Sequence, residues 1–177
     1  MNIGPRNTVT GVTLVELLVT IAVVAILLTL GVGGFRTLIA NAKMTNAANN
    51  LIGHLQFARS EAVKRSAEVS LCPSTTGTVC VAQSDGSWEI GYIVKLDATG
   101  QVLRWVGPSE MAGITVTKGG TSPRIVFKGD GTASGYACTL TLCDTGDPAN
   151  KRGVIISNVG RVRVSDYATG GSALTCP

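Results

Sequence analysis

The longest uninterrupted run of apolar residues lies near the N-terminus. Residues 17–35 read LLVTIAVVAILLTLGVGGF and carry no charged side chain. A helix of this length spans about 28 Å at about 1.5 Å per residue, close to the hydrocarbon thickness of a bilayer. The pattern therefore predicts a helix that crosses a membrane.

Further along the chain the apolar residues recur every three or four positions. This spacing places them on one face of a helix, which we expect to pack on a sheet. No proline occurs in residues 12–72, so one helix can continue from the apolar run to about Arg65. The residues on this face are Leu51, Leu55, Ala58 and Ala62.

Short segments with a strand pattern follow, separated by clusters of Gly, Pro, Asp and Ser. Twenty-two glycines and an aromatic content of 5% also favour turns and short strands. The pattern predicts an α+β fold in which a long N-terminal helix packs on an antiparallel β-sheet domain. The predicted strands are 68–72, 88–96, 101–106, 114–118, 124–128, 136–143, 154–157 and 161–164.

Composition limits the class of protein. The 177 residues suffice for one domain with a core, and 45% hydrophobic against 15% charged residues exclude a disordered chain. A single histidine, His54, disfavours histidine-based catalysis and multi-histidine metal sites, and we assign it no role. The GDGT segment at 129–132 lacks the lysine of a phosphate-binding loop and reads as a hairpin turn. We therefore expect no enzyme activity, no metal and no cofactor.

One acidic residue, Glu16, stands at the start of the apolar run. Gly11 followed by VTLVELLVTIAVVAIL resembles the processing signal of type IV pilins and type II secretion pseudopilins. The alternative is a plain signal anchor with an incidental glutamate. The resemblance divides the chain into a leader at 1–11, a transmembrane and filament-core helix at 12–38, and a periplasmic globular domain at 39–177.

The resemblance also implies roles for three residues. A prepilin peptidase cuts between Gly11 and Val12 and methylates Val12, which stands where the family usually has an aromatic residue. Glu16 then pairs with the N-terminal amine of a neighbouring subunit, because a carboxylate buried among apolar helices needs a partner. The implied partners are prepilin peptidase, the inner membrane and other pilins or pseudopilins.

Three segments of the domain resemble the FimT/GspH family of minor pilins and H-type pseudopilins. They are FARSEAVKR at 57–65, VSLCPS at 69–74 and WEIGYIVKLD at 88–97. The resemblance implies a type IV pilin-like fold and a single-pass inner-membrane protein with a periplasmic C-terminal domain. Two functions stay open: a minor pilin near the tip of a type IV pilus, which we favour, and the H-type pseudopilin of type II secretion.

Five cysteines follow the apolar run, and an oxidising periplasm allows them to pair. Cys72 and Cys80 flank a short loop that suits a disulfide, and the family resemblance implies the same pair. Cys176 is expected to pair with Cys138 or Cys143. Those two lie five residues apart and point to opposite faces of a strand, so only one of them faces Cys176.

Basic residues are concentrated near the C-terminus, which holds Lys151, Arg152, Arg161 and Arg163 against one acidic residue, Asp166. In a strand, Arg161 and Arg163 share a face about 7 Å apart, roughly two phosphate steps of one DNA strand. Starting from Gly160, the segment GRVRV resembles the G-R-x-R motif of FimT-type minor pilins that bind DNA in natural transformation. The resemblance implies DNA as a ligand. The alternative is an edge strand whose arginines discourage pairing with other sheets.

Overall fold

The computed structural model describes residues 11–81, 88–120 and 122–177, without the side chains at 29–34 and 36. The chain divides into two compact units, residues 1–39 and 40–177. A 52-residue helix, α1 (Leu14–Arg65), contributes to both units. The predicted leader lies outside the described residues except for Gly11.

In the first unit, Thr13 caps α1. Its hydroxyl Oγ1 accepts a hydrogen bond from the backbone N–H of Glu16 at 3.2 Å, and its carbonyl accepts one from Leu17 at 3.1 Å. This Thr-x-x-Glu pattern at a helix start satisfies backbone donors that would otherwise lack partners. All side chains at positions 11–28 are exposed.

Among the described residues, no helix has an apolar stretch long enough to cross a membrane. The predicted apolar run includes positions 29–34, whose side chains the structure does not describe.

In the second unit, one face of α1 forms the centre of the core. The predicted apolar positions are all fully buried, which confirms the helical face. Ser66 ends the helix with a φ of +50°, and the Ala67 N–H returns to the carbonyl of Ala62 at 3.1 Å. The buried residues on this face are Met44, Ala47, Ala48, Leu51, Leu55, Ala58 and Ala62.

In the part of the chain that the structure describes, the strands form two antiparallel sheets of four strands each, and a short 3-10 helix, η1 (Pro108–Met111), follows β3. The first sheet has the order β3-β2-β1-β5, from β1 (Val69–Pro73), β2 (Tyr92–Leu96), β3 (Val102–Val106) and β5 (Ile125–Phe127). The second has the order β4-β6-β7-β8, from β4 (Ile114–Lys118), β6 (Cys138–Asp144), β7 (Lys151–Ile156) and β8 (Val162–Ser165).

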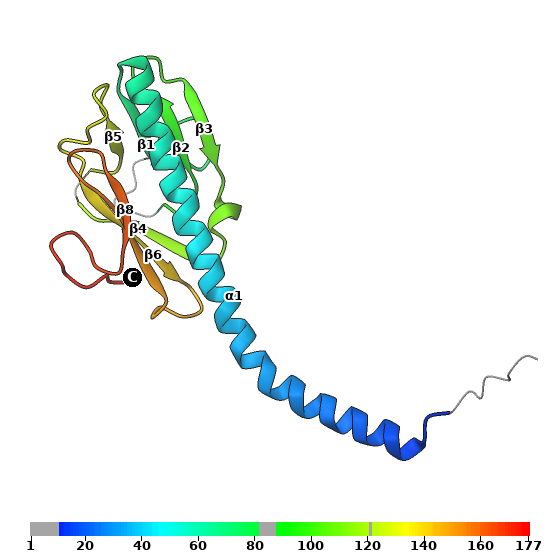
Figure 1. The fold of residues 1–177 in the computed structure, drawn as a ribbon. Coiled ribbons are helices and arrows are strands. Elements are labelled where there is room, and N and C mark those ends of the chain that lie inside the picture. Colours follow the sequence, from blue (N-terminus) through cyan, green and yellow to red (C-terminus); the bar gives the residue numbers. More distant parts are fainter. Residues whose placement is uncertain (1–10, 82–87, 121) are drawn as a thin grey trace, which may run out of the picture. The chain divides into compact units, whose positions relative to one another are not determined.

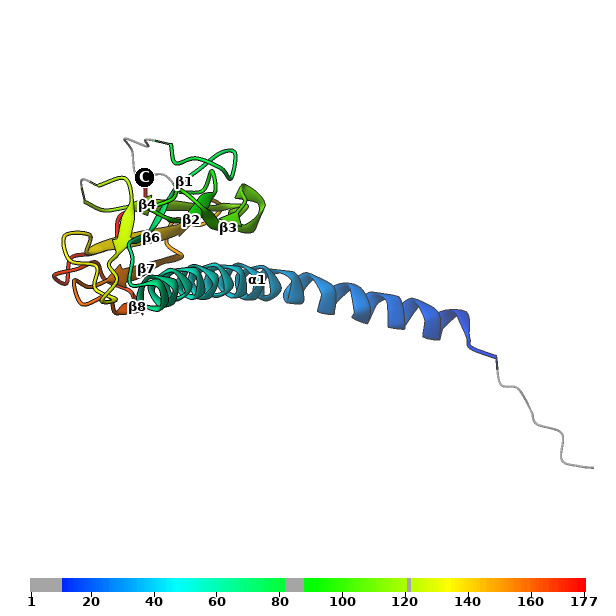
Figure 2. The ribbon, with the colours of Figure 1, turned by 90° about the horizontal axis from the view of Figure 1, so that it is seen from above.

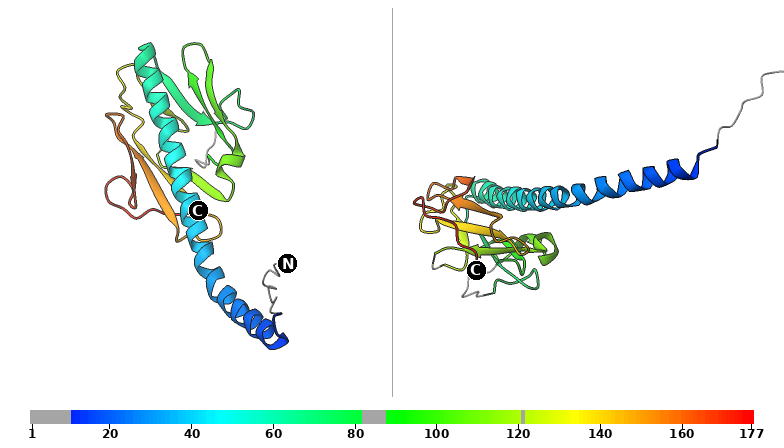
Figure 3. Two further views of the ribbon diagram at one scale, coloured as in Figure 1. Left: turned by 45° about the vertical axis from the view of Figure 1, so that its right-hand side comes forward. Right: turned by 90° about the horizontal axis from the view of Figure 1, so that it is seen from below.

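Residues 40–65 of α1 lie along both sheets (Figure 1). Seen from above, both sheets lie on the same side of this part of the helix (Figure 2), and two further views show the same packing (Figure 3). Inward-facing residues of both sheets, such as Leu71, Val94, Leu140 and Ile156, join the helix face in one core. The predicted α+β fold with a long helix packed on antiparallel sheets is therefore confirmed.

Two predicted strands begin three or four residues from the observed start, and the other boundaries differ by at most two residues. The segment 88–96 was expected to be one strand, but β2 begins only at Tyr92, because Gly91 has a φ of +99° and its N–H closes a turn on the carbonyl of Trp88 at 3.2 Å. β7 begins at Lys151 instead of at 154, since Lys151 still pairs with Cys143 of β6.

Two disulfides are present, Cys72 to Cys80 and Cys143 to Cys176, with Cα atoms 5.5 and 5.9 Å apart. Strand alternation explains which cysteine pairs with Cys176. Cys138 faces the core with Leu140 and Leu142, whereas Cys143 lies on the opposite face of β6, toward the C-terminal segment. The Cys138 thiol is left free and buried.

Candidate functional site

The predicted processing site lies just before the helix. Gly11 and Val12 have no regular secondary structure and are exposed, Val12 to 71%. Glu16 follows in the first turn of α1 and is also exposed. Its negative charge near the helix N-terminus is favourable because the first backbone N–H groups carry partial positive charge.

The exposed side chains of the first unit are mainly apolar. A continuous set of Leu, Val and Ile side chains around a helix is not stable in water and requires a lipid or protein environment. The large apolar residues exposed here are Leu14, Val15, Leu17, Leu18, Val19, Ile21, Val23, Val24, Ile26, Leu27, Leu28, Phe35, Leu38 and Ile39.

In the second unit, the GRVR segment forms the turn between β7 and β8 and the start of β8. Gly160 has a φ of +75° and lies so close to Gly131 that a Cβ atom would overlap the Gly131 carbonyl oxygen. Glycine is therefore required at position 160 by both conformation and space. Arg161 precedes β8, and Arg163 lies within it opposite Ile155.

Arg59 of α1 holds this turn in place. Its Nε donates to the carbonyl of Gly131 at 2.8 Å, and its Nη2 donates to the carbonyl of Val159 at 3.2 Å. One guanidinium thus links the helix to the 128–132 turn and to the β7–β8 turn. The sequence does not predict this role for Arg59, because its partners lie 72 and 100 residues away.

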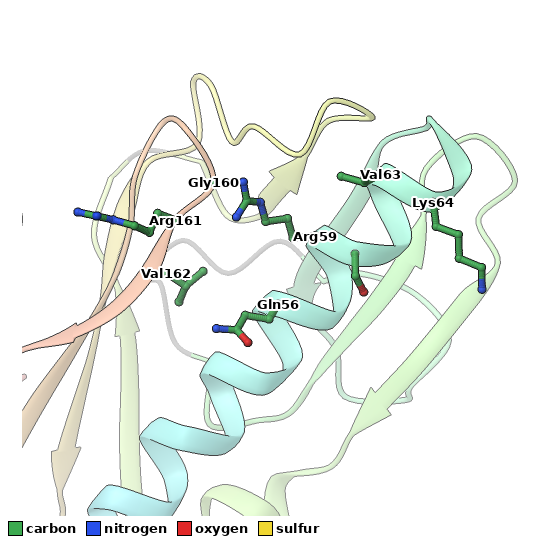
Figure 4. A pocket seen from close by; sticks show the side chains of 8 residues that line it. Gln56, Arg59, Val63, Lys64, Gly160, Arg161 and Val162 are labelled. Atoms are coloured by element: carbon green, nitrogen blue, oxygen red, sulfur yellow. The ribbon is translucent and has the colours of Figure 1, made fainter.

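Between α1 and the β7–β8 turn lies a groove with a volume of about 510 Å³, which we call the basic groove. Figure 4 shows Arg59 between α1 and the turn, whereas the side chains of Lys64 and Arg161 extend away from the groove in opposite directions. The lining contains these three cations and no carboxylate. Its residues are Gln56, Arg59, Ser60, Val63, Lys64, Gly160, Arg161 and Val162.

The structure does not bring Lys151 and Arg152 to this groove. In the β7–β8 register Ile156 pairs with Val162, so Arg161 lies beyond one end of β7 and Lys151 at the other, about 17 Å along the strand at about 3.4 Å per residue. Arg152 also forms an ion pair with Asp166 at 3.5 Å. The five predicted DNA-contacting residues therefore form two separate groups.

A polar pair joins α1 to the first sheet. His54 Nδ1 lies 2.7 Å from the hydroxyl of Tyr92, whose side chain is buried. Burial lowers the pKa of His54, the nearby Arg104 lowers it further, and Glu110 acts in the opposite direction. Burial raises the pKa of Tyr92 well above its ordinary value. His54, to which the sequence assigns no role, is thus a neutral hydrogen-bonding partner in the helix–sheet interface.

Within the described ranges, no group of three or more His, Cys, Asp or Glu side chains is arranged to hold a metal ion. Burial raises the pKa of the Cys138 thiol to about 11, which keeps it protonated and unreactive.

Two family models match the chain. One, described as type II transport protein GspH, covers residues 47–160, and the other, the prokaryotic N-terminal methylation motif, covers residues 6–32. No curated protein sequence matches.

A solved structure of a type IV minor pilin shares the fold. The crystal structure of the Pseudomonas aeruginosa type IV minor pilin FimU aligns with a TM-score of 0.58 at 24% identity, over 73% of this chain and 95% of that chain. The Vibrio cholerae minor pseudopilin EpsH aligns with a TM-score of 0.48 at 13% identity, over 70% of this chain and 96% of that chain.

Proposed function

The chain belongs to the GspH family of type II transport proteins, and from this membership we propose that it is a minor pilin that enters a type IV pilus near its tip. Family membership alone makes it a minor pilin or pseudopilin, a structural subunit with an N-terminal methylation motif. The observation that carries the proposal is the exposed apolar helix that begins within the motif, which requires lipid before assembly and neighbouring helices afterwards.

Before assembly, we place this helix in the inner membrane with residues 39–177 in the periplasm. The two disulfides support an oxidising compartment for the domain. We further propose that prepilin peptidase cuts between Gly11 and Val12, which are exposed ahead of the helix. Intact-mass analysis of the protein from membranes is expected to show loss of residues 1–11 and gain of one methyl group. A full-length mass would exclude processing at this bond.

The pilus and the secretion system are distinguished by where the subunit is found. A subunit of a pilus is expected in sheared surface filaments, and deletion of its gene is expected to reduce their number. If deletion instead leaves the filaments intact and stops export of secreted enzymes, the protein is the H-type pseudopilin.

We propose DNA as a ligand of the β7–β8 turn. Arg161 and Arg163 are exposed, and neither takes part in the ion pairs found among the described residues. Two exposed guanidinium groups two residues apart in the chain suit a phosphate backbone and provide no evident reading of base sequence. DNA binding also favours the pilus over the secretion system. A titration with a labelled duplex tests the proposal, because replacing both arginines with alanine is expected to abolish or strongly weaken binding.

A further inference from the structure

We infer that the free edge of β8 accepts an extended segment of a neighbouring filament subunit as a further strand of the second sheet, with one acidic side chain between two apolar ones. The inference rests on the chain being a pilin or pseudopilin subunit and does not depend on DNA as a ligand. It uses the backbone groups of Val162 and Val164, whereas the proposed DNA contact uses arginine side chains.

The direction of the β8 backbone groups follows from the ladder with β7. The Ser157 N–H donates to the carbonyl of Arg161 at 3.0 Å, so these two residues form a hydrogen-bonded pair. Hydrogen-bonded and non-hydrogen-bonded pairs alternate in an antiparallel ladder. Because β7 and β8 continue this register, Arg163 directs its N–H and C=O toward β7, and Val162 and Val164 direct theirs away from it. No hydrogen bond between described residues reaches these outward groups.

The other three outer strands do not offer such an edge. β3 shifts register against β2 between Val94 and Lys95, and β5 has only three residues. The edge of β4 is occupied, because the Trp88 N–H donates to the carbonyl of Val116 at 2.8 Å and the Val116 N–H donates to Oε2 of Glu89 at 3.3 Å. Irregular, very short and covered edges resist pairing with another chain. β8 pairs regularly with β7 along all four of its residues, so its backbone lacks this protection.

The surface beside β8 leaves room for a strand. Val164 is 42% exposed, so α1 leaves this part of the strand uncovered. Nearer the turn, the Val162 side chain lies toward Gln56 in the basic groove, which provides space beside that end of β8 (Figure 4). Strand alternation places both valines on the same face of β8. Apolar side chains on an added strand, directly opposite the two valines, would therefore cover them.

Arg163 determines the residue between these two apolar positions. A strand that bonds to Val162 and Val164 places its middle residue opposite Arg163 in a non-hydrogen-bonded pair, where side chains approach most closely. Arg163 is exposed and takes part in none of the ion pairs between described residues. A Glu or Asp in the middle position gives it a partner of opposite charge. The segment that fits the edge is therefore apolar, acidic, apolar.

A second copy of β8 does not fit this edge. Antiparallel pairing of two β8 strands through Val162 and Val164 sets Arg163 directly opposite Arg163, and like charges in such a pair are destabilising. The arginine thus discourages pairing between copies of this chain and still admits an acidic strand. We therefore commit to a strand from a different pilin or pseudopilin subunit.

The test measures binding of the fluorescein-labelled peptide Gly-Ser-Thr-Val-Glu-Val-Thr-Ser-Gly to the full-length protein, in neutral detergent, by anisotropy. The wild type is expected to bind this peptide and to reject the same peptide with Lys in place of Glu. Arg163→Glu is expected to reverse the preference. Binding of neither peptide, or of both equally, would overturn the inference.

Backbone pairing is tested on both partners. Methylation of the two valine nitrogens of the peptide removes N–H groups that face β8 and is expected to abolish binding, whereas methylation of the glutamate nitrogen, which faces away, is expected to preserve it. Val164→Pro removes an outward N–H and keeps the bonds to β7, so affinity is expected to fall about tenfold. Val164→Thr is the matched control and keeps the N–H. Equal binding by the two methylated peptides would exclude strand addition even if the proline variant did not fold.

Two further measurements separate this inference from DNA binding and identify the partner. Val164→Pro changes no charge and is expected to leave duplex affinity unaltered, so failure of either ligand leaves the other result intact. In membranes and filaments, Tyr167→benzoylphenylalanine places a photo-crosslinker just beyond β8, at a position that is 60% exposed. We expect a crosslink to an apolar–acidic–apolar segment of another pilin or pseudopilin that is lost in Val164→Pro. A crosslink to a segment without this pattern, or one that Val164→Pro does not change, would overturn the inference.

Discussion

The hydroxyl of Tyr92 lies 2.7 Å from Nδ1 of His54, and this hydrogen bond connects β2 to the C-terminal part of α1. Tyr92 is almost fully buried and lies 5.6 Å, ring centre to ring centre, from the buried Trp88. In a neutral imidazole, Nδ1 either accepts from the hydroxyl or donates to it, according to the tautomer. A protonated imidazole can only donate, and its charge is disfavoured by burial at this interface.

The protein is expected to lose stability as pH falls through the histidine range. The folded state lowers the pKa of His54 below 6.5, whereas the unfolded chain has the ordinary value. Between these two values the unfolded state binds more protons, so the free energy of unfolding decreases as pH is lowered from about 7.5 toward 5. Urea unfolding followed by circular dichroism at several pH values checks this.

Two variants separate this effect from general acid sensitivity. Tyr92→Phe removes the hydrogen bond and is expected to cost about 1 kcal/mol at pH 7.5. His54→Gln removes the titrating group, so its stability is expected to depend less on pH between 5 and 7.5. An unchanged pH dependence in His54→Gln would assign the effect to other residues.

Reduction of the Cys72–Cys80 disulfide is expected to alter the fluorescence of Trp105. The loop that this disulfide closes places Gly77 against the indole of Trp105, which is 39% exposed. Replacing both cysteines with alanine is expected to lower stability by about 2–3 kcal/mol and to shift the emission to the red as the loop moves off the ring. Trp105→Phe is the control, since the remaining Trp88 is buried in the core.

The Cys143–Cys176 disulfide is expected to protect the C-terminal segment from proteolysis. Leu174 is buried and packs against Gly153 of β7. A side chain at position 153 would crowd it. Cys176→Ser removes the anchor, so chymotrypsin is expected to cut after Leu174 much faster than in the wild type. Gly153→Ala, which crowds Leu174 with the disulfide intact, tests whether packing alone provides protection. Equal cutting rates in Cys176→Ser and the wild type would show that the disulfide is not needed.

Replacement of Glu16 is expected to reduce incorporation into filaments without preventing membrane insertion. Glu16→Gln removes the charge that we propose pairs with a neighbour's N-terminal amine, but a glutamine still suits the third position of a capped helix. Thr13→Ala is the matched control, because it removes the hydroxyl that caps α1 and keeps the carboxylate. Quantifying both variants in membrane and sheared-filament fractions checks the prediction, which fails if the two behave alike.

Local patterns predicted most of the elements, because burial of one helix face and strand alternation leave clear periods in the sequence. The buried residues from Leu51 to Ala62 and the positions of the strands follow from such periods. The start of β2 could not be predicted in this way, since the positive φ of Gly91 and its turn with Trp88 do not change the hydrophobic pattern. The i,i+4 ion pair of Glu61 and Arg65 was predictable from spacing and forms at 2.7 Å.

The arrangement of the candidate site depends on long-range contacts, which the sequence does not reveal. Arg59 reaches Val159 across 100 residues, and the separation of Lys151 from Arg161 depends on the register of β7 and β8. Charge counting grouped basic residues that are close in sequence, whereas the structure places Arg59 of α1 next to the turn that carries Arg161. The choice of Cys143 as the partner of Cys176 likewise required knowing which face of β6 the C-terminal segment covers.

Arg59 binds main-chain oxygens, and this makes the two turns tolerant of substitution. Because its partners are the carbonyls of Gly131 and Val159, an exchange of the Val159 side chain leaves the acceptor in place. Gly131 and Gly160 are restricted by their positive φ angles and close approach, and Gly129 is restricted by the Ser66 backbone. The Asp130 and Ser157 side chains form hydrogen bonds within the two turns. The exposed side chains of Asn158 and Val159 are free to vary while this frame stays constant, so the surface of the β7–β8 turn can acquire new ligand preferences by point substitution without refolding the domain.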